Sequence, residues 1–152
     1  MLFRSGARLR SLDGEPQHEG IVLGLNGTFA GNTGHHYFGL GDTVRDCSAV
    51  TAACLMVRRS VYEEAGGFDE AFKYDWNDVD FCLRLRQLGY RTIYTPHAVL
   101  YHHERATRGR SAQNSDPEDE RYCRRRWGDF GALRDPFYNS NFDLFQPYRL
   151  KV

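Results

Sequence analysis

The chain has 152 residues, which is enough for one domain that buries a core. Its composition, 41% hydrophobic and 14% aromatic, argues against a disordered chain. Twenty basic residues balance 20 acidic ones, so the formal net charge is zero and no overall field favours nucleic acid. We therefore predict a globular protein that has no nucleic-acid partner.

Cysteine usage and hydropathy indicate the compartment. The four cysteines are scattered and form no C-x-x-C pair, which favours free thiols in a reducing cytoplasm. The longest nearly apolar run, residues 49–57, is too short to span a bilayer. Residues 1–10 lack the apolar core of a signal peptide. We expect a cytoplasmic location.

The N-terminal part is predicted to hold a hairpin, a strand and a long loop. The Asp-Gly pair at 13–14 favours a hairpin turn between the short segments around Leu9 and Ile21, and residues 21–23 have the pattern of a buried strand. Glycine, asparagine and threonine dominate residues 24–46, which predicts a loop. His18 is interpreted as a hydrogen-bonded turn histidine rather than a catalytic group.

Strand and helix patterns alternate in the middle of the chain. Residues 50–58 are apolar on both faces, which predicts a central, buried strand. A short helix capped by Ser60 and a longer helix over 77–88 follow. Strands are then expected over 91–94 and 98–103, separated by a proline. This order of elements predicts an α/β fold.

The C-terminal part is predicted to begin with a helix. Pro117 suits the first helical position after a cap at Ser115 or Asp116, and the helix should continue through Trp127. The remaining residues are aromatic with little periodicity. We expect them to pack as an extended tail over the domain.

An acidic stretch ahead of the longer helix organises the chain. In the helix, Phe81, Leu85 and Leu88 recur at the spacing of one apolar face. Asn77 stands at the expected N-cap, and Asp80 three residues later can complete a capping-box-like arrangement. The pattern therefore predicts a helix whose first turn carries carboxylates.

The two carboxylates of this first turn are predicted to face different ways. Asp80 pairs with Arg84 at i, i+4 on the polar side. Asp78 lies on the same side as Cys82 and Leu85, so the helix turns it inward. A first-turn acid can simply suit the helix dipole, whereas a shielded carboxylate at a cleft can serve as a general base. The residues alone leave both readings of Asp78 open.

Two motifs carry a resemblance to a known family. GGFDE at residues 66–70, followed by NDVDFCLRLRQLGYRTIYTPHAVLYHHERATRG at residues 77–109, resembles the C-terminal half of family 2 glycosyltransferases with a GT-A fold. The closest likeness is to bacterial enzymes that build O-antigen and other surface polysaccharides. The resemblance implies an α/β, partial GT-A fold. Residues 1–110 would form the acceptor-side half of the transferase domain, with a C-terminal helix and aromatic tail at 111–152 packed on it.

The same resemblance implies an activity. Enzymes of this family transfer a sugar, with inversion, from a nucleotide-diphosphate sugar to a glycan or lipid-linked acceptor. A divalent cation, Mn²⁺ or Mg²⁺, neutralises the leaving diphosphate, and its main ligands are expected outside this chain. The location implied is cytoplasmic, with a peripheral place at the inner face of the cytoplasmic membrane left open. Without a nucleotide-binding half, the chain is expected to be inactive alone.

The resemblance also implies roles for individual residues. Many relatives have Glu where this chain has Asn77, a departure that leaves the base itself in place. His102 follows Asp78 by 24 residues at a strand end, although a structural histidine beside an aromatic ring is an equal alternative. The implied roles are general base for Asp78, acceptor binding for Asp75, Trp76 and Asp80, diphosphate binding for Arg108, and metal binding for His102.

Two other functions remain to be weighed. A metal-dependent hydrolase would require Asp78 and Asp80 to converge, but residues at i and i+2 on a helix diverge. A non-catalytic half-domain that binds carbohydrate or a partner is compatible with every residue. Turnover of a nucleotide sugar, against glycan binding without nucleotide, distinguishes the enzyme from the binding module.

Overall fold

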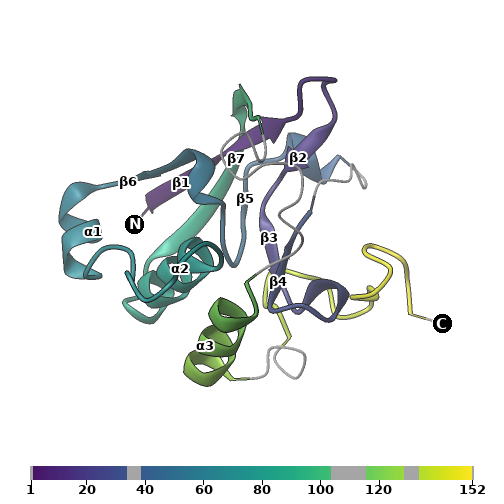
Figure 1. The fold of residues 1–152 in the computed structure, drawn as a ribbon. Helices are drawn as coiled ribbons and strands as arrows, with labels where there is room; N and C mark the ends of the chain where they lie inside the picture. Colours follow the sequence, from purple (N-terminus) through teal and green to yellow (C-terminus); the bar gives the residue numbers. More distant parts are fainter. Residues whose placement is uncertain (1, 34–38, 104–115, 129–133, 152) are drawn as a thin grey trace.

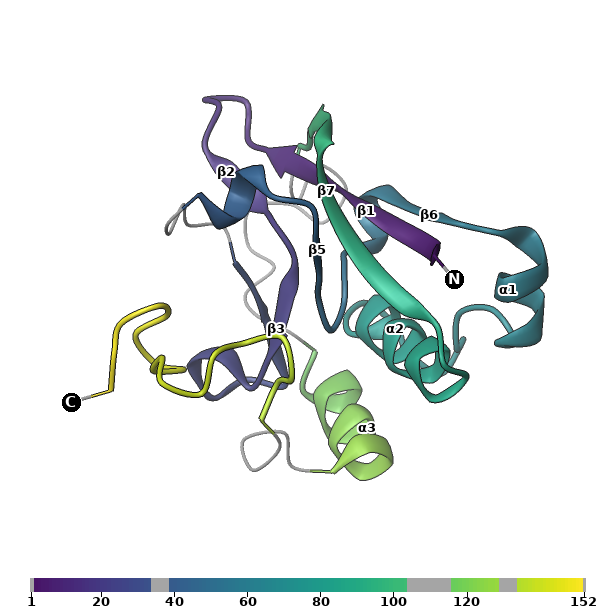
Figure 2. The same cartoon turned by 180° about the vertical axis from the view of Figure 1, so that it is seen from behind.

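The computed structural model describes residues 2–33, 39–103, 116–128 and 134–151, and Figures 1 and 2 show its fold from opposite sides. A mixed five-stranded sheet has the order β2-β1-β7-β5, with β6 also paired to β1. A separate two-stranded sheet pairs β3 with β4. The strands are β1 (Leu2–Arg10), β2 (Pro16–His18), β3 (Ile21–Leu23), β4 (Ala30–Asn32), β5 (Arg45–Asp46), β6 (Leu55–Val57) and β7 (Arg91–Tyr101).

Three α-helices and three short 3₁₀ turns complete the described part of the chain. In both views α2 lies between the large sheet and α3. The helices are α1 (Arg59–Glu64), α2 (Asn77–Gln87) and α3 (Pro117–Trp127), and the 3₁₀ turns are η1 (Leu25–Gly27), η2 (Leu40–Asp42) and η3 (Ala52–Cys54). The mixture of helices with a mixed sheet agrees with the predicted α/β class.

The centre of the large sheet is the parallel pair of β1 and β7. Strands β2, β5 and β6 all add antiparallel to this pair. The register of the pair jumps, because Ala7 lies opposite Thr95 but Arg8 lies opposite Val99. The two strands predicted around Pro96 are therefore one strand, since a bulge absorbs the proline without ending the pairing.

The N-terminal predictions are partly confirmed. The chain turns back at 13–14 as predicted, but β1 pairs with β2, with Leu9 opposite His18, and not with the segment around Ile21. That segment is β3, which is buried along its whole length and pairs with β4 instead. The loop predicted over 24–46 is wrong in part, because this segment also contains β4, β5, η1 and η2. Backbone pairing of β4 with β3 gives the segment a structure that its glycine-rich composition does not indicate.

The central buried strand predicted over 50–58 is wrong. Val50 is fully buried, but the chain then turns through η3, in which the Thr51 hydroxyl accepts a hydrogen bond from the Ala53 N–H. Only β6 remains extended, and it pairs with β1 alone, leaving Met56 75% exposed. The apolar run therefore places Val50 in the core and then forms the edge strand β6.

The helices match their predicted positions better than their predicted caps. The first residue of α1 is Arg59, and its N-cap makes no side-chain capping bond, so the predicted cap at Ser60 is wrong. The start of α3 is as predicted, with Pro117 in the first turn and the Asp116 carboxylate accepting from the Glu118 N–H at 2.7 Å. Of the three α-helices in the described residues, α3 alone begins with a side-chain cap.

The core lies between α2 and the large sheet. Phe81 and Leu85 are fully buried and pack with Val61 of α1. Leu88, predicted on the same apolar face, is the C-cap of α2 and is 46% exposed, so that part of the prediction is wrong. The opposite side of α2 contributes Val79, Cys82 and Leu83 to the main cluster, which also holds Phe29, Val50 and Tyr94. Because α2 is covered on two sides, its first turn is held between packed elements.

The C-terminal segment packs against β3 and η1. The Leu23 N–H donates to Asp135 Oδ2 at 2.8 Å, and the Asn26 N–H donates to the Leu144 carbonyl at 2.8 Å. Tyr138 and Tyr148 pack there with Val22 and Leu25. Within the described residues, no helix combines the length and apolarity that crossing a membrane requires. The division at residue 110 stays a prediction.

Candidate functional site

The acidic segment, residues 69–80, enters α2 through a residue in an unusual conformation. The N-cap of α2 is Trp76, with φ 65° and ψ −4°, and it makes no side-chain capping bond. The predicted N-cap at Asn77 is wrong, because Asn77 is already the first helical residue. A left-handed backbone at a bulky residue costs on the order of 1 kcal/mol or more, so the surrounding structure must hold it in place.

The indole of Trp76 is half-buried against the core. It meets Phe29 edge to face, with ring centroids 5.6 Å apart and planes at 77°. Its Nε1 is buried and has no hydrogen-bond partner within the described residues. The part of the indole that contacts Phe29 is packed against the core. That an acceptor sugar stacks on the part of the indole left exposed stays a prediction.

Asp78 is half-buried, and its carboxylate is turned toward residues 51 and 52, in the inward direction that its helical position predicts. Its Oδ2 accepts from the Ala52 N–H at 3.0 Å, and its Oδ1 accepts from the Val79 N–H at 2.8 Å. Burial raises the pKa of the Asp78 carboxyl, while these N–H groups and the Thr51 hydroxyl partly oppose that rise. The carboxylate is therefore oriented by fixed backbone donors and is a stronger base than a solvated one.

The buried residue His18 contacts the backbone at Thr51, next to the residue whose N–H binds Asp78. His18 is 1% exposed, and its Nε2 accepts from the Thr51 N–H at 3.4 Å. Its Nδ1 lies 2.6 Å from Asn32 Oδ1, which suits a proton on Nδ1. Burial lowers the pKa of His18 to about 4, so the ring is neutral near pH 7. This geometry agrees with the reading of His18 as a hydrogen-bonded structural residue.

Asp80 lies in the interior of the protein. Its side chain is 0% exposed, and its carboxylate accepts from Arg84 Nε at 2.8 Å and from Trp127 Nε1 at 2.9 Å. Arg126 Nε lies 3.3 Å away. The predicted pair with Arg84 is confirmed, but its placement on a polar surface is wrong, because α3 covers it. We leave Asp80 out of the proposed acceptor site.

Asp75 is engaged by the N-terminus of α3. Its Oδ2 accepts from the Asp116 N–H at 2.9 Å, and its own N–H donates to Asp119 Oδ2 at 2.9 Å. The side chain is half-buried. Its predicted acceptor contact stays a prediction, and the structure adds a role in joining the acidic segment to α3.

His102 follows the end of β7 that points away from α2 in both views. Its N–H donates to the Arg10 carbonyl at 2.8 Å, and its Nδ1 lies 3.2 Å from Gln17 Oε1. In the described ranges, no group of three or more His, Cys, Asp or Glu side chains is arranged so that it could hold a metal ion. One imidazole and one amide oxygen are too few to hold Mn²⁺ or Mg²⁺, so these residues do not fit a complete metal site. Arg108 lies outside the described residues.

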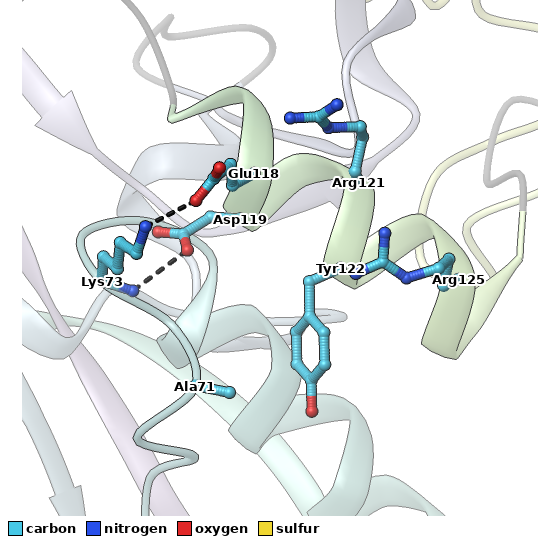
Figure 3. A pocket seen from close by; sticks show the side chains of 7 residues that line it. All are labelled: Ala71, Lys73, Glu118, Asp119, Arg121, Tyr122 and Arg125. Atoms are coloured by element: carbon cyan, nitrogen blue, oxygen red, sulfur yellow. Dashed lines mark hydrogen bonds and ion pairs between the residues drawn. The ribbon is translucent and has the colours of Figure 1, made fainter.

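An open pocket lies between α3 and the acidic segment (Figure 3). Its volume is about 270 Å³. Lys73 forms an ion pair with Glu118 at its mouth, and Asp119 accepts from the Lys73 N–H at 3.0 Å. None of the predicted site residues that the structure describes lines it. The lining residues are Ala71, Lys73, Glu118, Asp119, Arg121, Tyr122 and Arg125.

Three contributors to the site lack a local sequence signal. Thr51 and Ala52 hold the Asp78 carboxylate from 26 or more residues upstream. Asp119 holds the backbone of the acidic segment from 44 or more residues downstream. Each of these contacts depends on how the helices and the sheet pack, so a pattern within one turn cannot indicate them.

Comparison with known proteins supports a relation to glycosyltransferases. No protein-family model matches the chain. It is 40% identical to an uncharacterized protein, y4gI, of Sinorhizobium fredii, and 36% identical to the O-antigen biosynthesis protein RfbC of Myxococcus xanthus. Both matches cover 91% of this chain, but only 16% and 11% of those proteins.

A shorter match has a more specific name. Over 61 residues the chain is 39% identical to an N-acetylglucosaminyl-diphospho-decaprenol L-rhamnosyltransferase of Mycobacterium tuberculosis, covering 40% of this chain and 20% of that protein. The chain is therefore homologous to part of bacterial glycosyltransferases and spans a small fraction of their length.

Proposed function

We propose that the chain forms the acceptor-side part of an inverting glycosyltransferase of surface polysaccharide synthesis, with Asp78 as its general base. The observation that carries the proposal is the carboxylate of Asp78, which is turned inward and whose pKa burial raises. Homology to part of bacterial glycosyltransferases supports the reaction class. The donor would be a nucleotide-diphosphate sugar, and the acceptor a glycan or a lipid-linked saccharide.

In the proposed reaction an acceptor hydroxyl oxygen attacks the anomeric carbon of the donor. The bond from that carbon to the diphosphate oxygen breaks, and the diphosphate leaves with the electron pair. The hydroxyl proton passes to Asp78. The N–H groups of Val79 and Ala52 donate to the carboxylate oxygens at 2.8 and 3.0 Å, so the carboxylate is held in one orientation before the acceptor binds.

The remaining parts of the site are proposed with this mechanism. Asp75 and the outer part of Trp76 would contact the acceptor, and Arg108 would contact the donor diphosphate. A divalent cation would neutralise the leaving group, with its main ligands outside this chain and His102 as an added ligand. The place of action would be the cytoplasm or the inner face of the cytoplasmic membrane.

The test is the substitution Asp78→Asn in a protein that contains these 152 residues and turns over a nucleotide sugar. The variant should lose on the order of 10²-fold or more in kcat, because the amide cannot take the proton, while donor binding survives. Glu70→Gln is the matched control, since Glu70 is an exposed acid of the same segment. Near-normal turnover by Asp78→Asn would remove the base assignment.

Two further measurements test whether the chain is self-sufficient and whether it belongs to an enzyme or to a carbohydrate-binding module. In the first, calorimetric titration of UDP and dTDP with Mn²⁺ into the 152-residue chain should show no binding, because the nucleotide-binding part is expected elsewhere. Micromolar nucleotide binding by a monomer would show that the chain is self-sufficient. Glycan binding by a protein that never turns over a nucleotide sugar would favour the binding module.

A further inference from the structure

The first turn of α3 buries a carboxylate that no catalytic role explains. Asp119 is 2% exposed. Its Oδ1 accepts from the Lys73 N–H at 3.0 Å, and its Oδ2 accepts from the Tyr74 N–H at 2.8 Å and the Asp75 N–H at 2.9 Å. Figure 3 shows the contact with Lys73 at the edge of the pocket. One side chain therefore satisfies three successive backbone donors.

Successive N–H groups that converge on one anion hold the backbone in a defined curve. Burial alone would raise the pKa of the Asp119 carboxyl, but the three N–H groups outweigh it and the pKa lies below its ordinary value. The carboxylate is thus ionised in the folded protein near neutral pH. Its charge strengthens each of the three hydrogen bonds.

The attachment between α3 and the acidic segment is reciprocal. Asp75 Oδ2 accepts from the Asp116 N–H at 2.9 Å, so each segment receives a backbone N–H from the other. Further along α3, the Tyr122 hydroxyl donates to Asp69 Oδ2 at 3.0 Å and Trp127 Nε1 donates to Asp80 at 2.9 Å. These bonds attach α3 to the segment from Asp69 to Asp80.

The residue directly after this curve is Trp76, whose left-handed backbone needs external support. Asp78 follows two residues later at the start of α2. A displacement of the backbone at 73–75 would pass through Trp76 into the first turn of α2. It would thereby move the Asp78 carboxylate relative to the Ala52 N–H.

We propose that Asp119 is a positioning residue for the general base: it holds the backbone of 73–75 and, through Trp76, the first turn of α2 that carries Asp78. This inference rests on the proposed function for its catalytic consequence. The structural part, that Asp119 fixes the 73–75 backbone, holds independently of any activity. In this role Asp119 makes α3 part of the support of the catalytic site, although the sequence predicts α3 to lie outside the transferase half at residues 1–110.

The substitution Asp119→Asn tests the proposal. The amide keeps the shape but offers one acceptor oxygen and turns an NH₂ group toward the other donors. Glu118→Gln is the matched control, because it removes the neighbouring charge of α3 and an ion pair with Lys73 while leaving the three backbone bonds intact. Both variants are made in the complete protein that contains the chain.

The first measurement is amide hydrogen exchange, which needs no activity. The amides of Lys73, Tyr74 and Asp75 should exchange about tenfold faster or more in Asp119→Asn, with amides of β1 and β7 unchanged. Glu118→Gln should leave the three amides as they are. Unchanged exchange in Asp119→Asn would overturn the proposal.

The second measurement is kinetic. Asp119→Asn should lower kcat about tenfold or more at unchanged donor KM, and the acid limb of its pH profile should move to lower pH as water reaches Asp78. Faster exchange with normal kcat and an unmoved acid limb would leave Asp119 a structural residue only. If Asp78→Asn is fully active, the base assignment fails while the exchange result stands.

A second variant guards against misfolding. Asp119→Ser keeps one acceptor oxygen in a smaller volume and is used if Asp119→Asn does not fold. The same exchange and kinetic outcomes are expected of it. Failure of both variants to fold would assign Asp119 to overall stability and would also overturn the positioning role.

Discussion

The substitution Asp80→Asn separates a structural role of this carboxylate from an acceptor-binding one. The carboxylate is 0% exposed, pairs with Arg84 of its own helix and joins α2 to α3 through Arg126 and Trp127. Breaking a buried ion pair by neutralising one partner costs about 3–5 kcal/mol. Arg84 keeps its bond to the Gly67 carbonyl at 2.6 Å, and Asn keeps one acceptor, so the lower end applies. We expect a loss of about 3 kcal/mol in the free energy of unfolding.

Thermal and urea denaturation followed by circular dichroism measure this loss. About 3 kcal/mol corresponds to a fall in Tm of about 6–12 °C for a domain of this size. The matched control is Glu63→Gln, because Glu63 also pairs with an arginine at i, i+4, but with side chains 59% and 90% exposed. That control should lose less than about 0.5 kcal/mol. Equal stability of the two variants would refute the reasoning and return Asp80 to the candidates for acceptor binding.

Two further predictions concern buried groups. His18 has a pKa of about 4 in the folded protein against an ordinary value of 6.5, so the unfolded chain takes up the proton first as the pH falls. Stability should therefore decrease by about 3 kcal/mol between pH 6.5 and 4, and His18→Gln should flatten that part of a curve from urea titrations. Of the four cysteines, Cys54 alone is not buried, and burial raises the pKa of the Cys123 thiol. Iodoacetamide should label Cys54 first in the native protein, and equally fast labelling of Cys123, seen by mass spectrometry, would contradict the described packing.

Local signals in the sequence account for the elements that were predicted well. The turn at 13–14 and the start of α3 at Asp116 each depend on residues within one turn of the chain. The bounds of α2 follow from apolar spacing and a terminal glycine. Such features need only propensity and capping, which are properties of neighbouring residues.

Pairing between distant segments explains the elements that were predicted wrongly. The run at 50–58 has the composition of a central strand, but Thr51 caps a 3₁₀ turn and only β6 reaches the sheet. Pro96 has the local signal of a strand end, yet β1 pairs with β7 on both sides of the bulge. In both cases tertiary pairing decides between conformations that the local sequence leaves open.

The candidate site divides in the same way. The inward direction of Asp78 follows from the helical period alone, so the sequence predicts it. The burial of Asp80 does not, because it depends on Arg126 and Trp127 of α3, more than 40 residues later. The contact of Asp119 with the acidic segment spans a similar distance along the chain, so the sequence does not predict it either. The helical period thus gives the direction of each carboxylate but not the element that meets it.

The hydrogen-bond partners of the four aspartates of the acidic segment distinguish Asp78 from the other three, Asp69, Asp75 and Asp80. Asp69, Asp75 and Asp80 each accept a hydrogen bond from α3, so their charges hold that helix against the segment. The bonds described for Asp78 come instead from residues 51 and 52, between Val50 and β6, and from Val79 of its own helix. Three acids therefore attach α3, and the fourth faces the other side with a carboxyl whose pKa burial raises. An acid that only stabilised the helix dipole or attached α3 would have no reason to face residues 51 and 52. We therefore assign the general base to Asp78.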